Sequence, residues 1–436
     1  MKSTSSAPLL SLPAVCLTLI ATLPAAGAAP AGVVAVTVSA PDYDVRETPV
    51  SLLLPASALK AAADDKTVAA GNDVLIGQLE AAPDDQVRLS FMVRDLKAHA
   101  SRTYRVQTIA PRNKPESIHN VAGRESSKGV EVKRHGADVE FWIDGRLFTR
   151  YDVSSGPNKP YFYPLFAPDN HQVVRHWPLE KVGVETHDHP HHRGLWFTHG
   201  KLNDIDFWTE TGHVGRTVST GDTDLESGPV YGLMRATTDW IAPDNHTIAR
   251  DQREVRVYNT RDGYLMDFAI TVTALDKPLT WSDSKEALFG LRVADSMRAA
   301  LEKDEVARGL VAQGHILNAR GETDAATWGR PAEWCDYYGP VDGSTVGVAI
   351  LSDPRNPHSP THWQVRDYGL LAANPFGLHD FDKTQPKGKG DLTVPAGQSL
   401  VFRYRLLLHH GTTWEAGVAQ AWQAFATPPI VHLAAP

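Results

Sequence analysis

Hydrophobic and polar residues alternate with a period of two in several short runs near the start of the chain. The clearest runs are residues 33–38, 50–54 and 87–93, which are rich in valine and leucine. A period of two places successive side chains on opposite faces of an extended strand. Turn-forming residues separate the runs, so the pattern predicts a small immunoglobulin-like β-sandwich over residues 32–110.

The remainder of the chain continues this pattern after a polar stretch over residues 111–128, which we interpret as a linker. Only residues 295–306 and 413–425 have patterns typical of helices. Many short strands separated by Gly and Pro turns favour a two-sheet architecture. The sequence therefore predicts an all-β protein, with a large antiparallel β-supersandwich-like domain over residues 129–430. The strands expected there include residues 139–143, 253–258, 265–274, 345–351 and 400–409.

The N-terminus has the pattern of an export signal. Lys2 precedes an apolar stretch over residues 9–23, and small residues at 26–28 form an A-x-A-like cleavage site. The apolar stretch is too short to span a bilayer. We therefore expect a signal peptide over residues 1–28 and a periplasmic or secreted protein with no membrane span after cleavage. Whether Cys16 is lipidated stays open.

Composition narrows the range of partners. The 436 residues have a formal net charge of −8, which argues against a nucleic-acid partner because such proteins need a cationic surface. Signal cleavage would leave Cys335 as the last cysteine, so no intramolecular disulfide is expected. The sequence lacks the G-x-G-x-x-G, Walker, H-E-x-x-H and G-x-S-x-G signatures. Their absence argues against nucleotide-binding proteins, zincins and α/β-hydrolases.

Residues 187–199 are the segment richest in potential chemistry, since they contain five of the nineteen histidines. Imidazole titrates near neutral pH, transfers protons and binds transition metals. His189, His191 and His192 are therefore the first candidates for acid/base groups or substrate contacts. Arg193 follows them directly and is a candidate for binding an anionic or oxyanionic group. Asp188 or Arg193 is the candidate for orienting the imidazoles.

A binding site for a divalent metal is an alternative function of the same segment. On a strand, His187 and His189 would point to one face and form a pair of ligands. Pro190 bends the chain, so a third ligand from the same strand is not expected. Structural histidines in a loop are a third interpretation, and the sequence leaves all three open. The other candidates for a third ligand are Glu185, His362 and His379.

Aromatic and polar residues follow the histidines directly. Trp196 and its aromatic neighbours are candidates for a platform that stacks on a sugar ring, and Asn203 and Asp204 for directional hydrogen bonds to it. Packing in the hydrophobic core is an equal alternative for the aromatic rings.

Later segments supply candidates for the rest of a site. Glu286 and Asp336 are possible partnering carboxylates, although internal ion pairs are an alternative use of such residues. Residues 358–377 are expected to form the second wall of a cleft opposite the histidines, with a polar surface loop as the alternative. The further candidates for substrate contacts are Arg292, Arg330, His362, Trp363, Arg366 and Asn374.

Three longer runs resemble a known bacterial family. They are D-H-P-H-H-R-G-L-W-F-T-H-G-K-L-N-D-I-D-F-W from residue 188, K-E-A-L-F-G-L-R-V-A from residue 285 and V-R-D-Y-G-L-L-A-A-N-P-F-G from residue 365. They are similar to exported proteins of unknown function labelled methane oxygenase PmoA, from bacteria that degrade polysaccharides. The labelled membrane subunit needs several transmembrane helices, which this sequence does not have after its signal.

This resemblance covers about residues 130–425. It implies a role in carbohydrate metabolism by association. It also implies an architecture similar to the galactose-mutarotase-type supersandwich, in which histidines and a carboxylate surround a sugar. The resemblance does not identify any established catalytic residues.

These observations predict an exported carbohydrate-active enzyme, a lyase, hydrolase or epimerase, that uses histidine acid/base chemistry. The expected ligand is a small-molecule sugar or an oligosaccharide. A non-catalytic glycan-binding protein, or a metal-dependent oxidoreductase as the family label suggests, is the alternative. The sequence identifies no cofactor, and a bound divalent metal remains a mechanistic variant.

Overall fold

A computed structural model gives the fold of the chain. The expected signal peptide and the expected linker lie outside the residues that it describes. Those residues are 34–58, 66–70, 73–108, 129–156, 158–183, 185–301, 303–309 and 311–434.

The N-terminal unit is a single antiparallel sheet of seven strands in the order β2-β5-β4-β3-β6-β1-β26. The sheet curls around one core, because Phe91 on β5 and Tyr104 on β6 are not on adjacent strands yet lie 5.2 Å apart. A short 3₁₀ turn, η1 (Ala56–Ala58), follows β2. The strands are β1 (Val34–Ser39), β2 (Val45–Pro55), β3 (Lys66–Ala70), β4 (Asp73–Ala82), β5 (Gln86–Leu96), β6 (Ser101–Thr108) and β26 (Ile430–Leu433).

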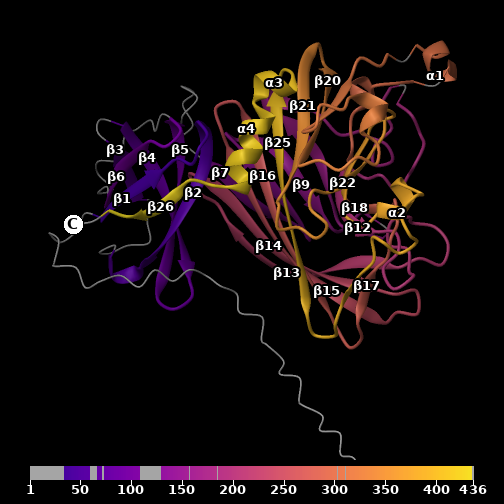
Figure 1. Ribbon diagram of the computed structural model, residues 1–436, viewed down its shortest axis with the longest axis horizontal. Helices are drawn as coiled ribbons and strands as arrows, with labels where there is room; N and C mark the ends of the chain where they lie inside the picture. The colour runs from indigo at the N-terminus through magenta and orange to yellow at the C-terminus, as the bar shows by residue number, and fades with distance from the viewer. Residues whose placement is uncertain are drawn as a thin grey trace, which may run out of the picture.

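The C-terminal strand joins this N-terminal sheet. β26 pairs antiparallel with β1, with Val38 opposite Val431, and Figure 1 shows its yellow ribbon within the indigo unit. The sequence pattern did not indicate this return of the chain. The two ends of the described chain are therefore held together by a β-ladder.

The rest of the described chain forms two large antiparallel sheets, one of nine strands and one of eight. The nine-stranded sheet contains β7 (Val130–His135), β8 (Asp138–Ile143), β9 (Arg146–Asp152), β10 (Tyr161–Ala167), β11 (His171–Gln172), β12 (Leu195–His199), β18 (Ala287–Arg292), β22 (His362–Val365) and β23 (Leu370–Asn374). The eight-stranded sheet contains β13 (Arg216–Glu226), β14 (Tyr231–Ile241), β15 (Thr247–Asn259), β16 (Gly263–Ala274), β19 (His315–Asn318), β20 (Trp334–Val341), β21 (Ser344–Ser352) and β25 (Ser399–His410). β17 (Leu279–Trp281) and β24 (Leu392–Val394) form a separate pair.

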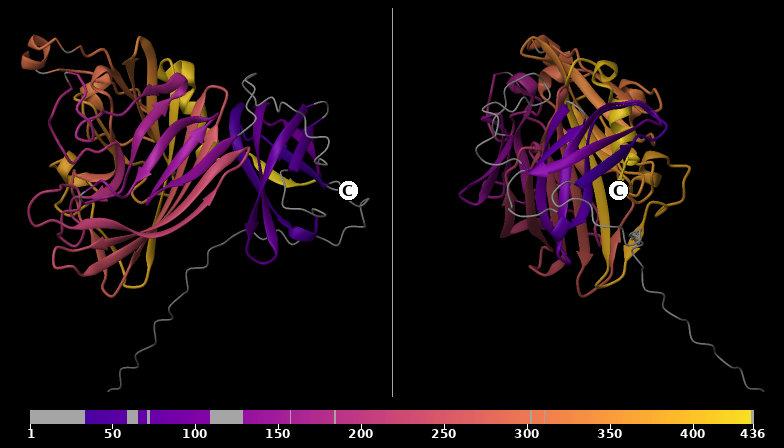
Figure 2. Two further views of the ribbon diagram at one scale, coloured as in Figure 1. Left: turned by 180° about the vertical axis from the view of Figure 1, so that it is seen from behind. Right: turned by 90° about the vertical axis from the view of Figure 1, so that its left-hand side faces the viewer.

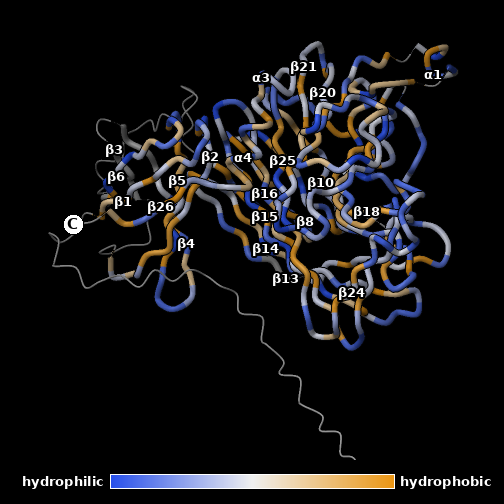
Figure 3. Tube along the Cα trace, in the orientation of Figure 1, coloured by the Kyte–Doolittle hydropathy of each residue, from blue (hydrophilic) through white to orange (hydrophobic). Residues whose placement is uncertain are grey.

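The two large sheets pack face to face as a sandwich (Figures 1 and 2). Aromatic side chains cross the interface: Phe162 lies 5.5 Å from Phe268, and Phe289 stacks on Tyr404 at 4.7 Å. Along β16 buried and less buried residues alternate over most of its length, and Figure 3 shows hydrophobic and hydrophilic residues interspersed through the sandwich. The predicted all-β fold class is confirmed, because period-two patterns place one face of each strand in a shared core.

Few helices occur in the described part of the chain. The helix predicted over residues 295–306 is wrong: the chain forms the 3₁₀ turn η4 (Asp295–Met297) and the short α1 (Lys303–Ala307). One reason is that both carboxylate oxygens of Asp295 accept hydrogen bonds from Thr186, so this residue anchors a loop instead. Three other short turns are η3 (Pro168–Asn170), η5 (Asp324–Thr327) and α2 (Leu378–Phe381).

The helical prediction for residues 413–425 is confirmed with a break in it. α3 (Thr413–Ala416) and α4 (Val418–Ala426) are separated by Gly417, which has a φ of 65°. Thr412 and Glu415 form a capping box at the start of α3. Val418 packs with Leu407 of β25, so α4 covers the outer face of the eight-stranded sheet.

Candidate functional site

A row of side chains crosses four neighbouring strands on the outer face of the nine-stranded sheet. The register pairs Trp196 on β12 with Gly290 on β18, Gly290 with Ala372 on β23, and Ala372 with Gln364 on β22. Directly paired residues point to the same face. The next residue, Phe197, points the other way onto β25, so the row faces outward. Segments far apart in sequence thus meet on the outer face of this sheet.

The histidine-rich segment before β12 is a loop, so the strand geometry considered for His187 and His189 is wrong. His189 has a φ of 41°, a left-handed backbone that a strand does not contain. A turn follows at Pro190, where His192 N donates to His189 O at 2.9 Å. His187 faces away and stacks on Trp177 at 4.2 Å. The two histidines therefore do not form a ligand pair.

Four rings form a continuous stack above the outward row. Tyr368 stacks on His189 at 5.1 Å, His189 on His192 at 4.7 Å, and His192 on Trp196 at 5.1 Å. His191 packs edge-on against His192 at 4.5 Å. The His189 side chain is 37% exposed, whereas Trp196 is 2% exposed. The stack thus runs from an accessible end to a buried end, and Trp196 offers no open platform.

Asp188 fixes the orientation of the accessible histidine. His189 Nδ1 donates to Asp188 Oδ2 at 2.7 Å, which leaves Nε2 as a proton acceptor. Arg292 Nη2 donates to both Asp188 oxygens at 3.0 Å, and Arg175 Nη1 donates to Oδ1. Burial opposes ionisation of Asp188, but the His189 hydrogen bond and the two arginine charges outweigh it and hold its pKa far below the usual range. Asp188 is therefore a permanent carboxylate.

The two neighbouring histidines are uncharged at neutral pH. Burial and the positive charge of Lys159, with His189 nearby, lower the pKa of His191 to about 4. Burial, with Arg292 nearby, lowers the pKa of His192 well below its ordinary value. Their lowered pKa values make both imidazoles weak bases, so they line the site as neutral polar groups.

A second charged group borders the stack. Lys159 is buried, and its Nζ donates to Glu210 Oε1 at 3.0 Å and to Trp208 O at 2.9 Å. Arg193 Nε donates to both Glu210 oxygens at 3.0 Å. Arg193, which we predicted to bind an anion, is therefore already engaged by a carboxylate.

Glu286 is the predicted carboxylate that lies near the histidines. It precedes β18, accepts from Gln364 Nε2 at 2.7 Å, and accepts from Lys285 Nζ at 2.5 Å. Its charge partly opposes the lowering of the His191 pKa. Glu286 thus acts electrostatically on the histidine group while its own oxygens are bound.

Buried polar atoms without a hydrogen-bond partner among the described residues gather around this group. Such atoms are costly in a folded protein, and functional sites are one common explanation for them. They are Arg175 Nε, Arg292 Nε and Nη1, His192 Nδ1, Trp196 Nε1, Trp208 Nε1 and Gln364 Oε1.

Two of the predicted sugar contacts are turn residues instead. Asn203 Nδ2 donates to Pro278 O at 3.1 Å, and its Oδ1 accepts from Thr280 N at 2.6 Å. Asp204 is exposed and lies 3.5 Å from Lys201. Asn203 anchors the start of β17, and neither side chain contacts the ring stack.

Two of the three predicted arginines in the later segments have other contacts. Arg330 is exposed and lies 3.7 Å from Glu322. Arg366 lies 4.7 Å from the ring of Trp328. Arg292 is the predicted arginine that the fold brings to the histidines.

The remaining predicted residues of β22 and β23 have structural contacts. Trp363 is buried in the sandwich core, and its Nε1 donates to Ala332 O at 3.0 Å. Asn374 Nδ2 donates to Ser284 O and Lys285 O at 2.9 Å. His362 stacks on Phe381 of α2 at 6.1 Å.

Asp336 does not partner the histidines. It lies on β20 of the eight-stranded sheet, where it accepts from His409 Nε2 at 3.1 Å and from Thr413 Oγ1 at 2.6 Å. Thr413 begins α3, so Asp336 is fully buried beneath that helix. This carboxylate links a helix to the sheet.

The described part of the chain contains no preformed metal-binding site. No group of three or more His, Cys, Asp or Glu side chains is placed there to hold an ion. The candidates for a third ligand are engaged elsewhere: Glu185 accepts from His176 Nδ1 at 2.8 Å, and His379 Nδ1 donates to Gln385 O at 2.6 Å.

Sequence reasoning missed four residues of the group: Lys159, Arg175, Glu210 and Tyr368. Tyr368 lies within the V-R-D-Y-G run, so the run signalled the correct segment but the wrong side chains. The three charged residues stand outside any motif. Only the strand order brings them to the histidines.

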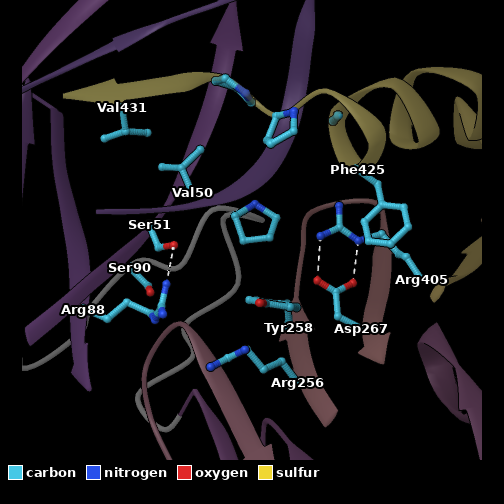
Figure 4. A pocket seen from close by; sticks show the side chains of 14 residues that line it. Val50, Ser51, Arg88, Ser90, Arg256, Tyr258, Asp267, Arg405, Phe425 and Val431 are labelled. Atoms are coloured by element: carbon cyan, nitrogen blue, oxygen red, sulfur yellow. Dashed lines mark hydrogen bonds and ion pairs between the residues drawn. The ribbon is translucent and has the colours of Figure 1, made fainter. Parts of the chain in front are cut away.

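A separate cavity of about 280 Å³ lies between the N-terminal sheet and the sandwich (Figure 4). Arg405 at its wall is paired with Asp267, at 2.5 and 2.7 Å. Arg256 Nη2 donates to Glu80 at 3.0 Å. Arg405 and Arg256 are thus paired with carboxylates of the protein, and none of the residues that line this cavity belongs to the histidine group.

The chain belongs to a family of unknown function, DUF6807, whose model matches residues 138–423. No curated protein matches it in sequence. Solved structures similar to it include a protein in glycosyl hydrolase family 38 from Enterococcus faecalis, with 10% identity and a TM-score of 0.40 over 93% of this chain and 48% of that one. An alpha-mannosidase from Enterococcus faecalis V583 gives 9% identity and a TM-score of 0.38, over 93% and 46%. The chain therefore spans about half the length of these structures.

Helices in the described residues are all too short or too polar to cross a membrane.

Proposed function

We propose that this protein is an exported carbohydrate-active enzyme in which His189 is the general base. One observation carries the proposal: the ionised Asp188 holds Nδ1 of a partly exposed His189, so that Nε2 is presented as a proton acceptor. A carboxylate that orients a histidine in this way is a recurring device of acid/base catalysis.

The surroundings of His189 support a chemical role over passive binding. Trp196 and Trp208 are 2% and 1% exposed, so neither offers the flat open ring on which a glycan-binding protein stacks a sugar. The neutral His191 packs edge-on against His189 at 5.8 Å, so no second charged imidazole lies beside the dyad. The sequence resemblance to proteins of polysaccharide-degrading bacteria supports a sugar substrate.

The test compares His189→Ala with Arg330→Ala, an exposed residue with no contact to the ring stack. Both proteins and the unaltered protein are incubated with a panel of plant and algal oligosaccharides. Products are measured by mass spectrometry and binding by calorimetry. We expect His189→Ala to lose about 10²-fold or more of turnover while binding persists, and Arg330→Ala to be unchanged.

Two results would contradict the proposal. One is equal turnover by His189→Ala and the unaltered protein. The other is binding of glycans with no product from any member of the panel, which would identify a glycan-binding protein instead.

A further inference from the structure

We propose that the substrate carries a carboxylate, as a uronic-acid sugar does, and that Arg292 binds this carboxylate while His189 removes the neighbouring proton. The inference rests on the proposed function and narrows it to one reaction class. Four features of the site support it: a pair of buried arginines, their free N–H atoms, the partners of the nearby carboxylates, and the position of Tyr368.

The arginine pair is unusual in its burial. Arg175 and Arg292 are both 0% exposed, and both donate to Asp188. The next carboxylate, Asp295, is reached from Arg175 only through Thr186. Two buried guanidinium groups thus share one directly bound carboxylate, and a buried cation needs further anionic or hydrogen-bonding partners.

Arg292 keeps free donors for such a partner. Its Nη2 is used by Asp188, whereas its Nε and Nη1 have no partner among the described residues. Nε packs beneath Gly369, where an added Cβ would lie 3.3 Å away. Nη1 is therefore the donor best placed for a ligand, and a guanidinium is well suited to bind a carboxylate.

Tyr368 controls access to this donor. Its ring lies 4.5 Å from the Arg292 guanidinium and stacks on His189. Tyr368 is partly exposed, and the Asp188 side chain beside it is 39% exposed. Binding of a ligand at both His189 and Arg292 therefore requires this ring to move aside, because Nη1 is fully buried with the ring in this position.

The carboxylates around the stack argue against glycoside hydrolysis. That reaction needs a carboxylate pair, usually with one member protonated as the general acid. Asp188 is held ionised by two arginines, Glu210 is bound by Lys159 and Arg193, and Glu286 by Lys285 and Gln364. All three are engaged by cations, so none is a free acid.

With a uronic acid as substrate, His189, Arg292 and Tyr368 are sufficient for cleavage of the chain by elimination. His189 Nε2 takes the proton from C5, next to the carboxylate whose negative charge Arg292 offsets. The electron pair of the C5–H bond forms a C4=C5 double bond, and the C4–O bond to the leaving sugar breaks. The Tyr368 hydroxyl gives its proton to that oxygen and regains one from His189. The products are a shortened chain and an unsaturated uronate, and no other reactant is needed.

The experiment offers the full chain polygalacturonate, alginate, and carboxyl-reduced polygalacturonate as the neutral control. The readouts are the ultraviolet absorbance of the conjugated double bond and the mass of the products. We expect unsaturated products from a polyuronate and none from the reduced polymer. Arg292→Lys should lose about 10-fold and Arg292→Ala about 10²-fold of kcat/KM. Arg330→Ala should be unchanged, and circular dichroism of each variant verifies folding.

The outcomes separate the two proposals. Equal turnover of the reduced polymer, or turnover of neutral glycans alone, would overturn the carboxylate inference and leave the carbohydrate-active enzyme standing. Saturated products with inverted C5 would overturn elimination in favour of epimerisation. No binding or turnover of any glycan would overturn both proposals.

Discussion

Asp188 is the residue on which the geometry of the site depends most. It accepts hydrogen bonds from His189, Arg175 and Arg292, so one carboxylate both orients the base and offsets two buried cations. Removing one partner of a buried charge cluster lowers the free energy of unfolding by more than the whole cluster contributes to it, because the other charges stay buried without a counter-charge. Stability and chemistry are therefore coupled at this position.

Replacing Asp188 with asparagine tests this coupling. We expect Asp188→Asn to lower the free energy of unfolding by about 3–5 kcal/mol, since both guanidinium groups lose their counter-charge. Asp204→Asn is the matched control: Asp204 is exposed, and its loss should cost less than about 0.5 kcal/mol. Urea unfolding measures both variants. Equal stability of the two would show that the arginines do not depend on Asp188.

The uncharged histidines give the protein a defined pH dependence. The pKa of His191 is about 4 in the folded protein and 6.5 as a model value, so the unfolded chain binds more protons between these values. Stability should therefore fall as the pH drops from about 6.5 to about 4, and this group adds no further loss below that range. His192 and His199 act in the same direction.

His191→Gln should reduce this loss without abolishing it. The measurement is the urea midpoint of both proteins at neutral and at mildly acidic pH. Lys159, Glu210 and Glu286 are the charged neighbours that act on the imidazole, together with His189, and all four stay in place in the variant. An identical pH dependence in the two proteins would show that His191 is not held neutral.

At the scale of single elements, the loop before β12 is fixed by its backbone more than by its histidines. Gly194 joins this loop to the strand with a φ of 51°, and a Cβ there would lie 2.1 Å from Phe162 O. The loop and β10 therefore approach so closely that only glycine fits.

Gly194→Ala should consequently destabilise the protein by about 3 kcal/mol or more, because strain and overlap add. Gly136→Ala is the control for backbone strain alone, since Gly136 has a φ of 63° and no atom within 4 Å of the added Cβ. It should cost about 1 kcal/mol. Thermal unfolding compares the two. Similar losses would mean that the overlap with β10 is relieved without cost.

The elements were predictable from sequence to different degrees, for physical reasons. Period-two patterns found strands such as β16 and β25, because a half-buried strand must alternate. A loop at His189 was one of the interpretations that the sequence left open, but the left-handed backbone of this residue follows from no pattern in the sequence. Tyr368 and Arg175 could not be assigned, because only the order β22-β23-β18-β12 and the loop before β12 bring them to the histidines.

At the scale of the whole molecule, the C-terminus fastens the N-terminal sheet to the sandwich. β26 completes that sheet beside β1, and α4 precedes it on the sandwich. Gln78 and Glu80 of β4 add hydrogen bonds to Tyr231 on β14. The two units are thus linked by the chain ends as well as by side chains.

Val431→Asp tests the importance of β26. Val431 packs against the N-terminal core, so a charge there should loosen the strand and speed amide exchange in β1 by about 10-fold or more. His432→Asp is the control, because His432 is exposed on the same strand. Hydrogen exchange with mass spectrometry reads out β1 directly. Unchanged exchange in Val431→Asp would show that β26 is dispensable to the sheet.

The most direct test of the central claim is a crystal structure of His189→Ala with an oligogalacturonate. We predict a sugar ring beside Tyr368 and residue 189, with its carboxylate within hydrogen-bond distance of Arg292. A sugar bound only in the cavity between the N-terminal sheet and the sandwich, or nowhere on the outer face of the nine-stranded sheet, would contradict the claim that the histidine group is the site of chemistry.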